Sequence, residues 1–140
     1  MDRHKIDLAS PPSEGLSASL TDALAKAGQT LSSDELSPFL FHIQDPSGAL
    51  LAGCKGEIAF QSAHIGELWV HADLRGQGIG RALLQRAETY AVEMGCFRIH
   101  IETRNEKARA LYEKCGYHVF GTLERYEGEN SYYYLEKRLG

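Results

Sequence analysis

The sequence has no long apolar run and no apolar segment near its start. None of the apolar stretches in its 140 residues approaches the roughly 18 residues that a membrane-spanning helix needs. The opening residues, Met1 to Lys5, are mostly charged, and no apolar core of a signal peptide follows them. We therefore expect a soluble protein that has no membrane partner.

Cysteine is also scarce. The chain has three cysteines, which is an odd number, and none of them forms a C-x-x-C pair. This pattern argues against a disulfide framework and against a cysteine-based zinc site. The histidines show no metal-ligand spacing either, so we expect no metal. Reduced cysteines are typical of the cytoplasm, where we place the protein.

An excess of positive charge is missing as well. The formal net charge is −4 and the isoelectric point is near 5.8, whereas nucleic-acid-binding domains are usually basic. We expect no nucleic-acid partner. A mildly acidic protein attracts cationic or amine-bearing molecules, although the same charge also fits a role in solubility alone.

Apolar periodicity and turn residues divide the chain into helices and strands. Apolar residues recur at steps of three or four from Leu16 to Leu31 and again from Ile79 to Met94, which predicts two helices. Asn105 is a good N-cap for a shorter helix that ends at Gly116. Strands are expected at residues 37–44, 49–60, 64–71, 97–103, 117–124 and 131–138, with a weak one at 4–9.

This order of elements predicts a single α/β (α+β) domain over residues 1–140. An apolar fraction of 43% is enough for one compact core, and the length leaves little room for a second. Three consecutive strands, two crossover helices and a final hairpin imply a mixed sheet that helices cover on both faces.

The sharpest local pattern is the glycine-rich loop Arg75-Gly76-Gln77-Gly78-Ile79-Gly80, between a predicted strand and a predicted helix. A helix N-terminus carries unpaired N–H groups and a partial positive charge, and glycines let an anion approach the backbone. Arg75 and Arg81 flank the loop and add charge. The spacing lacks the last position of a dinucleotide fingerprint, and no Gly-Lys-Ser/Thr of a P-loop is present. The loop therefore predicts a phosphate or pyrophosphate site, with a purely structural turn as the alternative.

Two segments together resemble one enzyme family. The spacing Arg75-x-x-Gly78-x-Gly80, directly after Leu68-Trp69-Val70, resembles the acetyl-CoA signature of the GNAT N-acetyltransferases. The segment from Asn105 through Ala108 and Tyr112 to Gly116-Tyr117 is similar to the second signature of that family. The resemblance covers about residues 37–139 and is closest to small bacterial members. It implies the GNAT fold, in which a mixed, mostly antiparallel sheet of six to seven strands lies between helices.

The resemblance also implies a set of site residues. In the family, the pantetheine arm of acetyl-CoA pairs with the strand before the loop, the loop holds the pyrophosphate, and a tyrosine acts as general acid near the leaving sulfur. Carried onto this sequence, Tyr112 becomes the general acid, with core packing of its ring as the alternative. The implied acetyl-CoA-binding residues are Leu68, Trp69, Val70, Arg75, Gly76, Gln77, Gly78, Ile79, Gly80, Arg81, Asn105, Ala108 and Tyr112.

The acceptor amine must lose a proton, because a lysine-like amine with a pKa of about 10.4 is almost fully protonated at pH 7. Glu102 and Glu67 are equal candidates for a general base and His64 is a third. Each also fits an ordinary role, as a solvated carboxylate or a hydrogen-bonded histidine. Relatives that acetylate protein N-termini imply Glu102, and histone acetyltransferase relatives imply the position of His64.

The predicted function is transfer of an acetyl group from acetyl-CoA to a primary amine of a small molecule or protein, by direct attack in a ternary complex. Two alternatives stay open, a catalytically silent CoA-binding regulatory module and a general nucleotide-binding module. Tyr126 and the run Tyr132-Tyr133-Tyr134 fit an acceptor pocket, core packing or a homodimer surface.

Overall fold

The computed structural model describes residues 4–31 and 35–140 and divides the chain into two compact units, 1–35 and 36–140. The first unit contains helix α1, Glu14–Lys26, which begins where the Ser13 hydroxyl accepts a hydrogen bond from the Leu16 N–H at 3.1 Å. The helix ends earlier than the periodicity predicts, because Gly28 turns the backbone to a φ of 71°. That residues 1–140 form a single domain stays a prediction.

The weak strand predicted at residues 4–9 is wrong. Residues 4–9 have no regular secondary structure. Ile6 and Leu8 alternate with polar residues as in a strand, but the segment pairs with no strand in the described part of the chain. Alternation alone does not form a strand, since the backbone needs a hydrogen-bonding partner.

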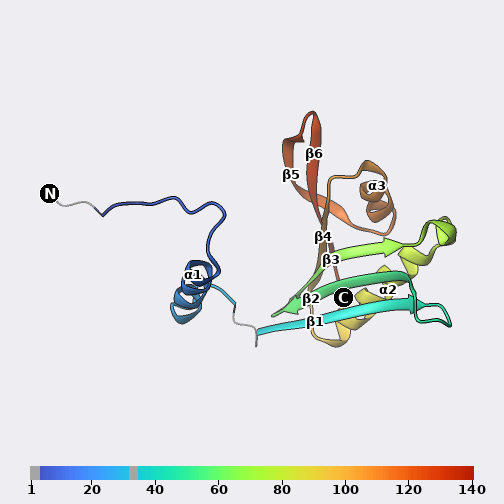
Figure 1. The fold of residues 1–140 in the computed structure, drawn as a ribbon. Helices are drawn as coiled ribbons and strands as arrows, with labels where there is room; N and C mark the ends of the chain where they lie inside the picture. Colours follow the sequence, from blue (N-terminus) through green and yellow to red (C-terminus); the bar gives the residue numbers. More distant parts are fainter. Residues whose placement is uncertain (1–3, 32–34) are drawn as a thin grey trace. The chain divides into compact units, whose positions relative to one another are not determined.

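The second unit is a six-stranded sheet with two helices (Figure 1). Its elements are β1 (Leu36–Gln44), β2 (Leu50–Ala59), β3 (Ser62–Val70), α2 (Ile79–Glu93), β4 (Arg98–Thr103), α3 (Glu106–Lys114), β5 (His118–Glu127) and β6 (Asn130–Arg138). The strand order is β1-β2-β3-β4-β6-β5, and only β3 and β4 are parallel. The prediction of a mixed, mostly antiparallel sheet of six to seven strands is confirmed. No helix among the described residues is long and apolar enough to cross a membrane.

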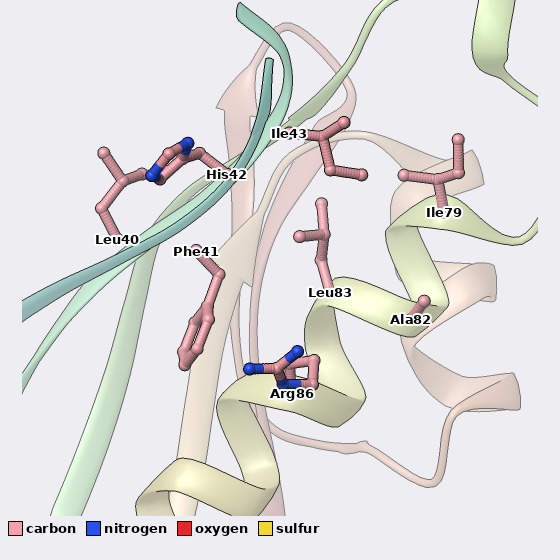
Figure 2. Close-up of a pocket in the computed structure, with 8 residues that line it drawn as sticks. All are labelled: Leu40, Phe41, His42, Ile43, Ile79, Ala82, Leu83 and Arg86. Atoms are coloured by element: carbon pink, nitrogen blue, oxygen red, sulfur yellow. The ribbon is translucent and has the colours of Figure 1, made fainter. Parts of the chain in front are cut away.

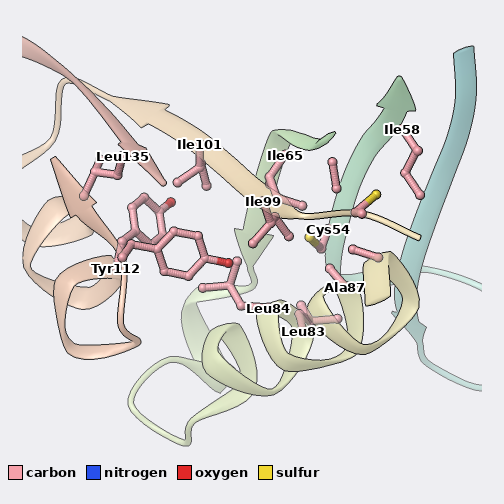
Figure 3. Close-up of a cluster of buried hydrophobic side chains, with 14 of the residues drawn as sticks. Cys54, Ile58, Ile65, Leu83, Leu84, Ala87, Ile99, Ile101, Tyr112 and Leu135 are labelled. Carbon is pink, nitrogen blue, oxygen red and sulfur yellow. The ribbon is translucent and has the colours of Figure 1, made fainter. Parts of the chain in front are cut away.

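Both helices of this unit pack on the same face of the sheet (Figure 3). Leu83, Leu84, Ala87 and Ala91 of α2 and Tyr112 of α3 belong to one buried cluster with inward-facing strand residues. The largest fully buried side chains of the strands are Ile65, Ile99 and Leu135. The opposite face carries polar side chains such as His64 and Glu102, and a helix over that face stays a prediction.

The cysteines in this unit are free, and Cys54 lies in the core. Burial raises the pKa of the Cys54 thiol to about 11, so the thiol stays protonated and packs as a small apolar group.

A β-bulge in β3 opens the sheet. Lys55 pairs with Glu67 while the next residue, Gly56, pairs with Ile65, so Gly66 is an extra residue in β3. The parallel ladder between β3 and β4 ends at Ile65 opposite Ile101. Beyond this point β4 continues along β6 to Thr103. Leu68 to Val70 therefore leave β4 and keep only β2 as a paired neighbour among the described strands.

Gly56 permits this bulge. A Cβ atom at Gly56 would lie 2.0 Å from the backbone oxygen of His64 and 2.9 Å from the Phe39 ring. The obstacle is backbone, which cannot swing aside as a flexible side chain does. Only glycine fits at this position.

We predict that Gly56→Ala destabilises the protein by about 1–3 kcal/mol, because the added methyl group overpacks the contact between β2 and the backbone of β3. Gly53→Ala in the same strand is the matched control, since its Cβ would stay 3.6 Å or more from its neighbours. Urea denaturation of the two variants measures the difference. Equal urea midpoints for both variants would show that Gly56 is not tightly packed against β3.

Candidate active site

The site begins where β3 leaves β4. A cavity of about 460 Å³ lies between the end of β3 and α3. Its lining residues come from two stretches far apart in the sequence, 68–80 and 105–112: Leu68, Trp69, Val70, Arg75, Gly80, Asn105, Lys107, Ala108, Leu111 and Tyr112. The cavity thus borders the edge of β3 that the bulge releases from the ladder.

The glycine-rich loop forms the neighbouring end of the site. Gly76 and Gly78 both have a φ of +79°, a left-handed conformation that glycine adopts without strain. Gly78 is the N-cap of α2 and offers no side-chain cap, and the first hydrogen bond of the helix runs from the Ala82 N–H to the Gly78 oxygen at 3.0 Å. The N–H groups of Ile79, Gly80 and Arg81 precede that bond and have no partner within the helix.

A second cavity of about 340 Å³ lies on this loop. It is lined by Val70, Leu74, Arg75, Gly76, Gly78, Ile79, Gly80, Arg81 and Leu111. It shares four residues with the first cavity, so the two are neighbours. The helix N-terminus and the two arginines make this end positive, which suits a phosphate group.

Arg75 ties the loop to the strand. Its Nε donates a hydrogen bond to the backbone oxygen of Val70 at 3.1 Å. Gln77 lines neither cavity, and its amide reaches back to the Asp73 oxygen at 3.5 Å. Of the residues that the sequence predicts for acetyl-CoA, Gln77 is therefore the one outside these cavities.

Asn105 caps α3. Its Oδ1 accepts a hydrogen bond from the Ala108 N–H at 2.9 Å, and its own N–H donates to the Thr103 hydroxyl at 3.1 Å. The cap fixes the first turn of α3 against the first cavity. It also occupies the Ala108 N–H, which leaves the Ala108 side chain as the part that lines the cavity.

Tyr112 is the buried polar residue of the first cavity. It is 7% exposed, and its hydroxyl forms no hydrogen bond with another described residue. Burial, and to a lesser degree the neighbouring Cys54 and Cys115, raise the pKa of Tyr112 to about 12. The nearby Tyr117 differs, because its hydroxyl donates to Glu88 at 3.0 Å. Tyr112 is thus a neutral donor without a partner among the described residues.

A second group of polar residues lies on the opposite face of the sheet, on β2, β3 and β4. His64 contacts two carboxylates: its Nδ1 lies 2.7 Å from Glu57 Oε1, and its Nε2 lies 2.8 and 3.0 Å from the two oxygens of Glu102. The His100 ring stacks on the His64 ring with centroids 4.8 Å apart. The register explains the group, because His64 pairs with Glu57 on one side and with His100 on the other.

The two histidines have opposite pKa shifts. Burial lowers the pKa of His64, but the hydrogen bonds to Glu57 and Glu102 outweigh it and the net pKa is raised. Burial and the charge of His64 lower the pKa of His100. The two carboxylates thus favour the charged form of His64, whereas the surroundings of His100 favour its neutral form.

The base candidates differ in their surroundings. Glu102 is half-buried and held by His64. Glu67 is exposed, pairs with Lys55 across the strands, and forms no hydrogen bond or ion pair in the described part of the chain. Sequence reasoning missed Glu57 and His100, because only the pairing register of distant strands brings them to His64.

Three tyrosines of the β5–β6 hairpin form an aromatic cluster. The Tyr132 ring lies 4.6 Å from Tyr126 and 5.3 Å from Tyr134, centroid to centroid. Tyr134 pairs with Glu102 and therefore shares its face of the sheet. Tyr133 points to the other face, where its hydroxyl donates to Glu106 of α3. The cluster of Tyr126, Tyr132 and Tyr134 thus adjoins Glu102.

A further cavity of about 410 Å³ lies between β1 and α2 (Figure 2). Its lining is largely apolar and includes Phe41, Ile43, Leu83 and Arg86. Among the predicted site residues only Ile79 reaches it.

Comparison with known proteins gives consistent results. The model of the acetyltransferase (GNAT) family matches residues 7–117. The chain is 34% identical over 93 residues to blasticidin-S acetyltransferase from Streptomyces morookaense, covering 66% of this chain and 68% of that protein.

Solved structures share the fold. An acetyltransferase from Bacillus cereus superposes with a TM-score of 0.82 at 24% identity, covering 98% of each chain. A protein from Bacillus anthracis, solved in complex with acetyl coenzyme A, superposes with a TM-score of 0.66 at 19% identity, over 81% of this chain and 71% of that one. Since the family model spans most of the sequence and the fold agrees, the chain belongs to the acetyltransferase (GNAT) family.

Proposed function

We propose that the protein is a cytoplasmic N-acetyltransferase that moves an acetyl group from acetyl-CoA to a primary amine by direct attack in a ternary complex. One observation carries the proposal. Two neighbouring cavities join a helix N-terminus suited to an anion to a released strand edge and to the hydroxyl of Tyr112. A donor with a diphosphate at one end and a thioester at the other matches this arrangement.

The pyrophosphate is assigned to the loop of residues 75–81. The N–H groups at the start of α2 and the two arginines bind it through charge-assisted hydrogen bonds. The pantetheine arm then runs beside Trp69 and Val70 as an added strand. The Val70 oxygen already accepts a hydrogen bond from Arg75, so the N–H groups of this edge provide the remaining pairing.

In the transfer step the amine nitrogen attacks the thioester carbonyl carbon and the carbon–sulfur bond breaks. A backbone N–H of the β3 edge stabilises the developing oxyanion. The thiolate leaves beside Tyr112. With the Tyr112 pKa near 12 and a thiol pKa near 8.5, full proton transfer is uphill by about 5 kcal/mol. Tyr112 therefore acts as a hydrogen-bond donor to the thiolate.

Glu102 is assigned as the group that takes the proton of the amine. It lies at the end of β4, just past the point where β3 and β4 separate, and His64 holds its carboxylate in place. Glu67 has no such support. We accordingly assign the proton transfer to Glu102 with His64, rather than to Glu67.

The acceptor is assigned to the face that carries Glu57, Glu102 and the tyrosine cluster. Carboxylates and aromatic rings attract an ammonium group. The relative named blasticidin-S acetyltransferase makes blasticidin S the first acceptor to test.

The alternative is a CoA-binding module without catalysis. The same loop and strand edge would serve it, and Tyr112 would then matter for packing alone. Binding and rate therefore have to be measured separately.

Within this proposal, the first prediction concerns the glycine-rich loop. Gly78→Ala should weaken acetyl-CoA binding at least tenfold, because a side chain strains a φ of +79° at the phosphate site. Calorimetric titration measures the affinity, which we expect near micromolar for the unmodified protein, about −8 kcal/mol. Gly48→Ala is the matched control, with a similar φ of +91° in a distant turn. Equal loss in both variants, or ATP and NAD binding as well as acetyl-CoA, would refute the assignment.

The second prediction separates enzyme from binding module. Tyr112→Phe should lower kcat about 100-fold and change acetyl-CoA affinity less than threefold, because the hydroxyl stabilises only the leaving thiolate. Tyr90→Phe is the control, since Tyr90 is a half-buried tyrosine of α2 outside both cavities. The rate of CoA release with a panel of amines, measured for both variants, tests this prediction. An unchanged rate in Tyr112→Phe would remove Tyr112 from the chemistry.

The third prediction ranks the two carboxylates. Glu102→Gln should lower kcat/KM at least 100-fold, within the range for a lost general base. Glu67→Gln should lower it less than threefold, because Glu67 is exposed and unsupported. Steady-state kinetics at one pH tests both variants. The reverse ranking would place the base on β3.

A further inference from the structure

The polar face of the sheet brings together ligands that suit a metal ion. One nitrogen from each of His64 and His100 and one Glu102 oxygen all lie within 4.8 Å of one another. They come from positions far apart in the sequence, which β3 and β4 place side by side. We propose that this group binds a divalent transition-metal ion of the Zn²⁺ type.

The donor set determines the class of ion. Two imidazoles and one carboxylate form a set typical of zinc sites that keep a fourth position open for water. Imidazole favours Zn²⁺, Co²⁺, Ni²⁺ or Cu²⁺, whereas Mg²⁺ and Ca²⁺ prefer oxygen ligands alone. Magnesium is therefore the natural negative control.

The distances require two small local movements. Ligand atoms bound at about 2.1 Å around a tetrahedral ion lie roughly 3.4 Å apart. His64 Nε2 and the Glu102 oxygens are 2.8 and 3.0 Å apart, so they separate slightly when the ion replaces the proton between them. His100 must turn its ring toward the ion. No hydrogen bond to a residue in the described ranges holds the His100 ring, which stacks on His64.

Glu57 lies where a carboxylate that supports a metal-bound histidine would be expected. Metal-bound histidines usually donate their other ring N–H to a carboxylate, which fixes the ring and increases its basicity. Glu57 Oε1 lies 2.7 Å from Nδ1 of His64 and leaves Nε2 directed at Glu102.

The charge around the site also fits. Glu57 and Glu102 carry two negative charges that balance a dication. The cation on the same strand, Arg98, lies 3.6 Å from Glu136 and donates to the Ser62 hydroxyl, so its charge is already compensated.

Metal binding would control the proposed reaction. An ion on Glu102 and His64 occupies the group assigned to take the amine proton, so zinc would inhibit transfer reversibly. This consequence rests on the proposed function, whereas binding of the ion does not.

The experiment is a calorimetric titration of the metal-free full chain with Zn²⁺ and, separately, with Mg²⁺. We expect one zinc ion per chain with a micromolar or tighter Kd and no response to magnesium. His100→Ala and Glu102→Gln should each weaken zinc binding at least tenfold, and Glu57→Gln about 10–100-fold. His118→Ala is the matched control and should bind normally, since it removes a histidine of β5 with a 61% exposed side chain. Circular dichroism verifies that each variant is folded.

Imidazole nitrogen chemical shifts from NMR identify the ligands directly. Zinc should shift the His64 and His100 signals and leave His118 unchanged. Binding weaker than millimolar, unshifted His64 and His100 signals, or full affinity in both ligand variants would overturn the proposal. In a transfer assay, zinc should inhibit the unmodified enzyme and not His100→Ala. If no amine is acetylated at all, the proposed function fails, while the titration still decides the metal site.

Discussion

The extra residue Gly66 in β3 is the constraint on which the rest of the site depends. It ends the parallel ladder with β4 after Ile65 and sends the end of β3 away from its neighbour. Gly56 must lack a side chain, because a Cβ atom there would overlap the backbone oxygen of His64 in β3. A regular β3 would keep pairing with β4, so neither the released edge at Leu68–Val70 nor the cavity beside Tyr112 would exist.

The same bulge separates two chemical environments. On the helix face, α2 and α3 bury an apolar core and bring a positive helix N-terminus and Tyr112 to the edge of β3. On the opposite face, His64 joins two carboxylates beside a tyrosine cluster. A thioester carbonyl placed at the gap between β3 and β4 would be accessible to an amine bound at the polar face. On this basis we propose direct attack rather than a covalent enzyme intermediate.

Local patterns allowed most of the fold to be predicted. Periodicity and glycine positions located both helices of the sheet unit and all six strands, because each element depends on neighbours in the sequence. The strand at residues 4–9 failed because its alternation lacks a pairing partner. The loop from Arg75 to Gly80 and the cap at Asn105 could be predicted, since their residue types act through the adjacent backbone. The places of Glu57 and His100 in the site could not be predicted, because they depend on the pairing register of β2, β3 and β4. Burial of Tyr112, which sets its pKa, also depends on packing between distant elements.

The most direct test of the account is an amide NMR titration with CoA. The account predicts that the largest shifts fall on the N–H groups of Gly78, Ile79, Gly80 and Arg81 and on the β3 edge at Trp69 and Val70. Shifts concentrated instead at Phe41, Ile43 and Arg86, around the cavity between β1 and α2, would contradict the placement of the donor and with it the proposed reaction.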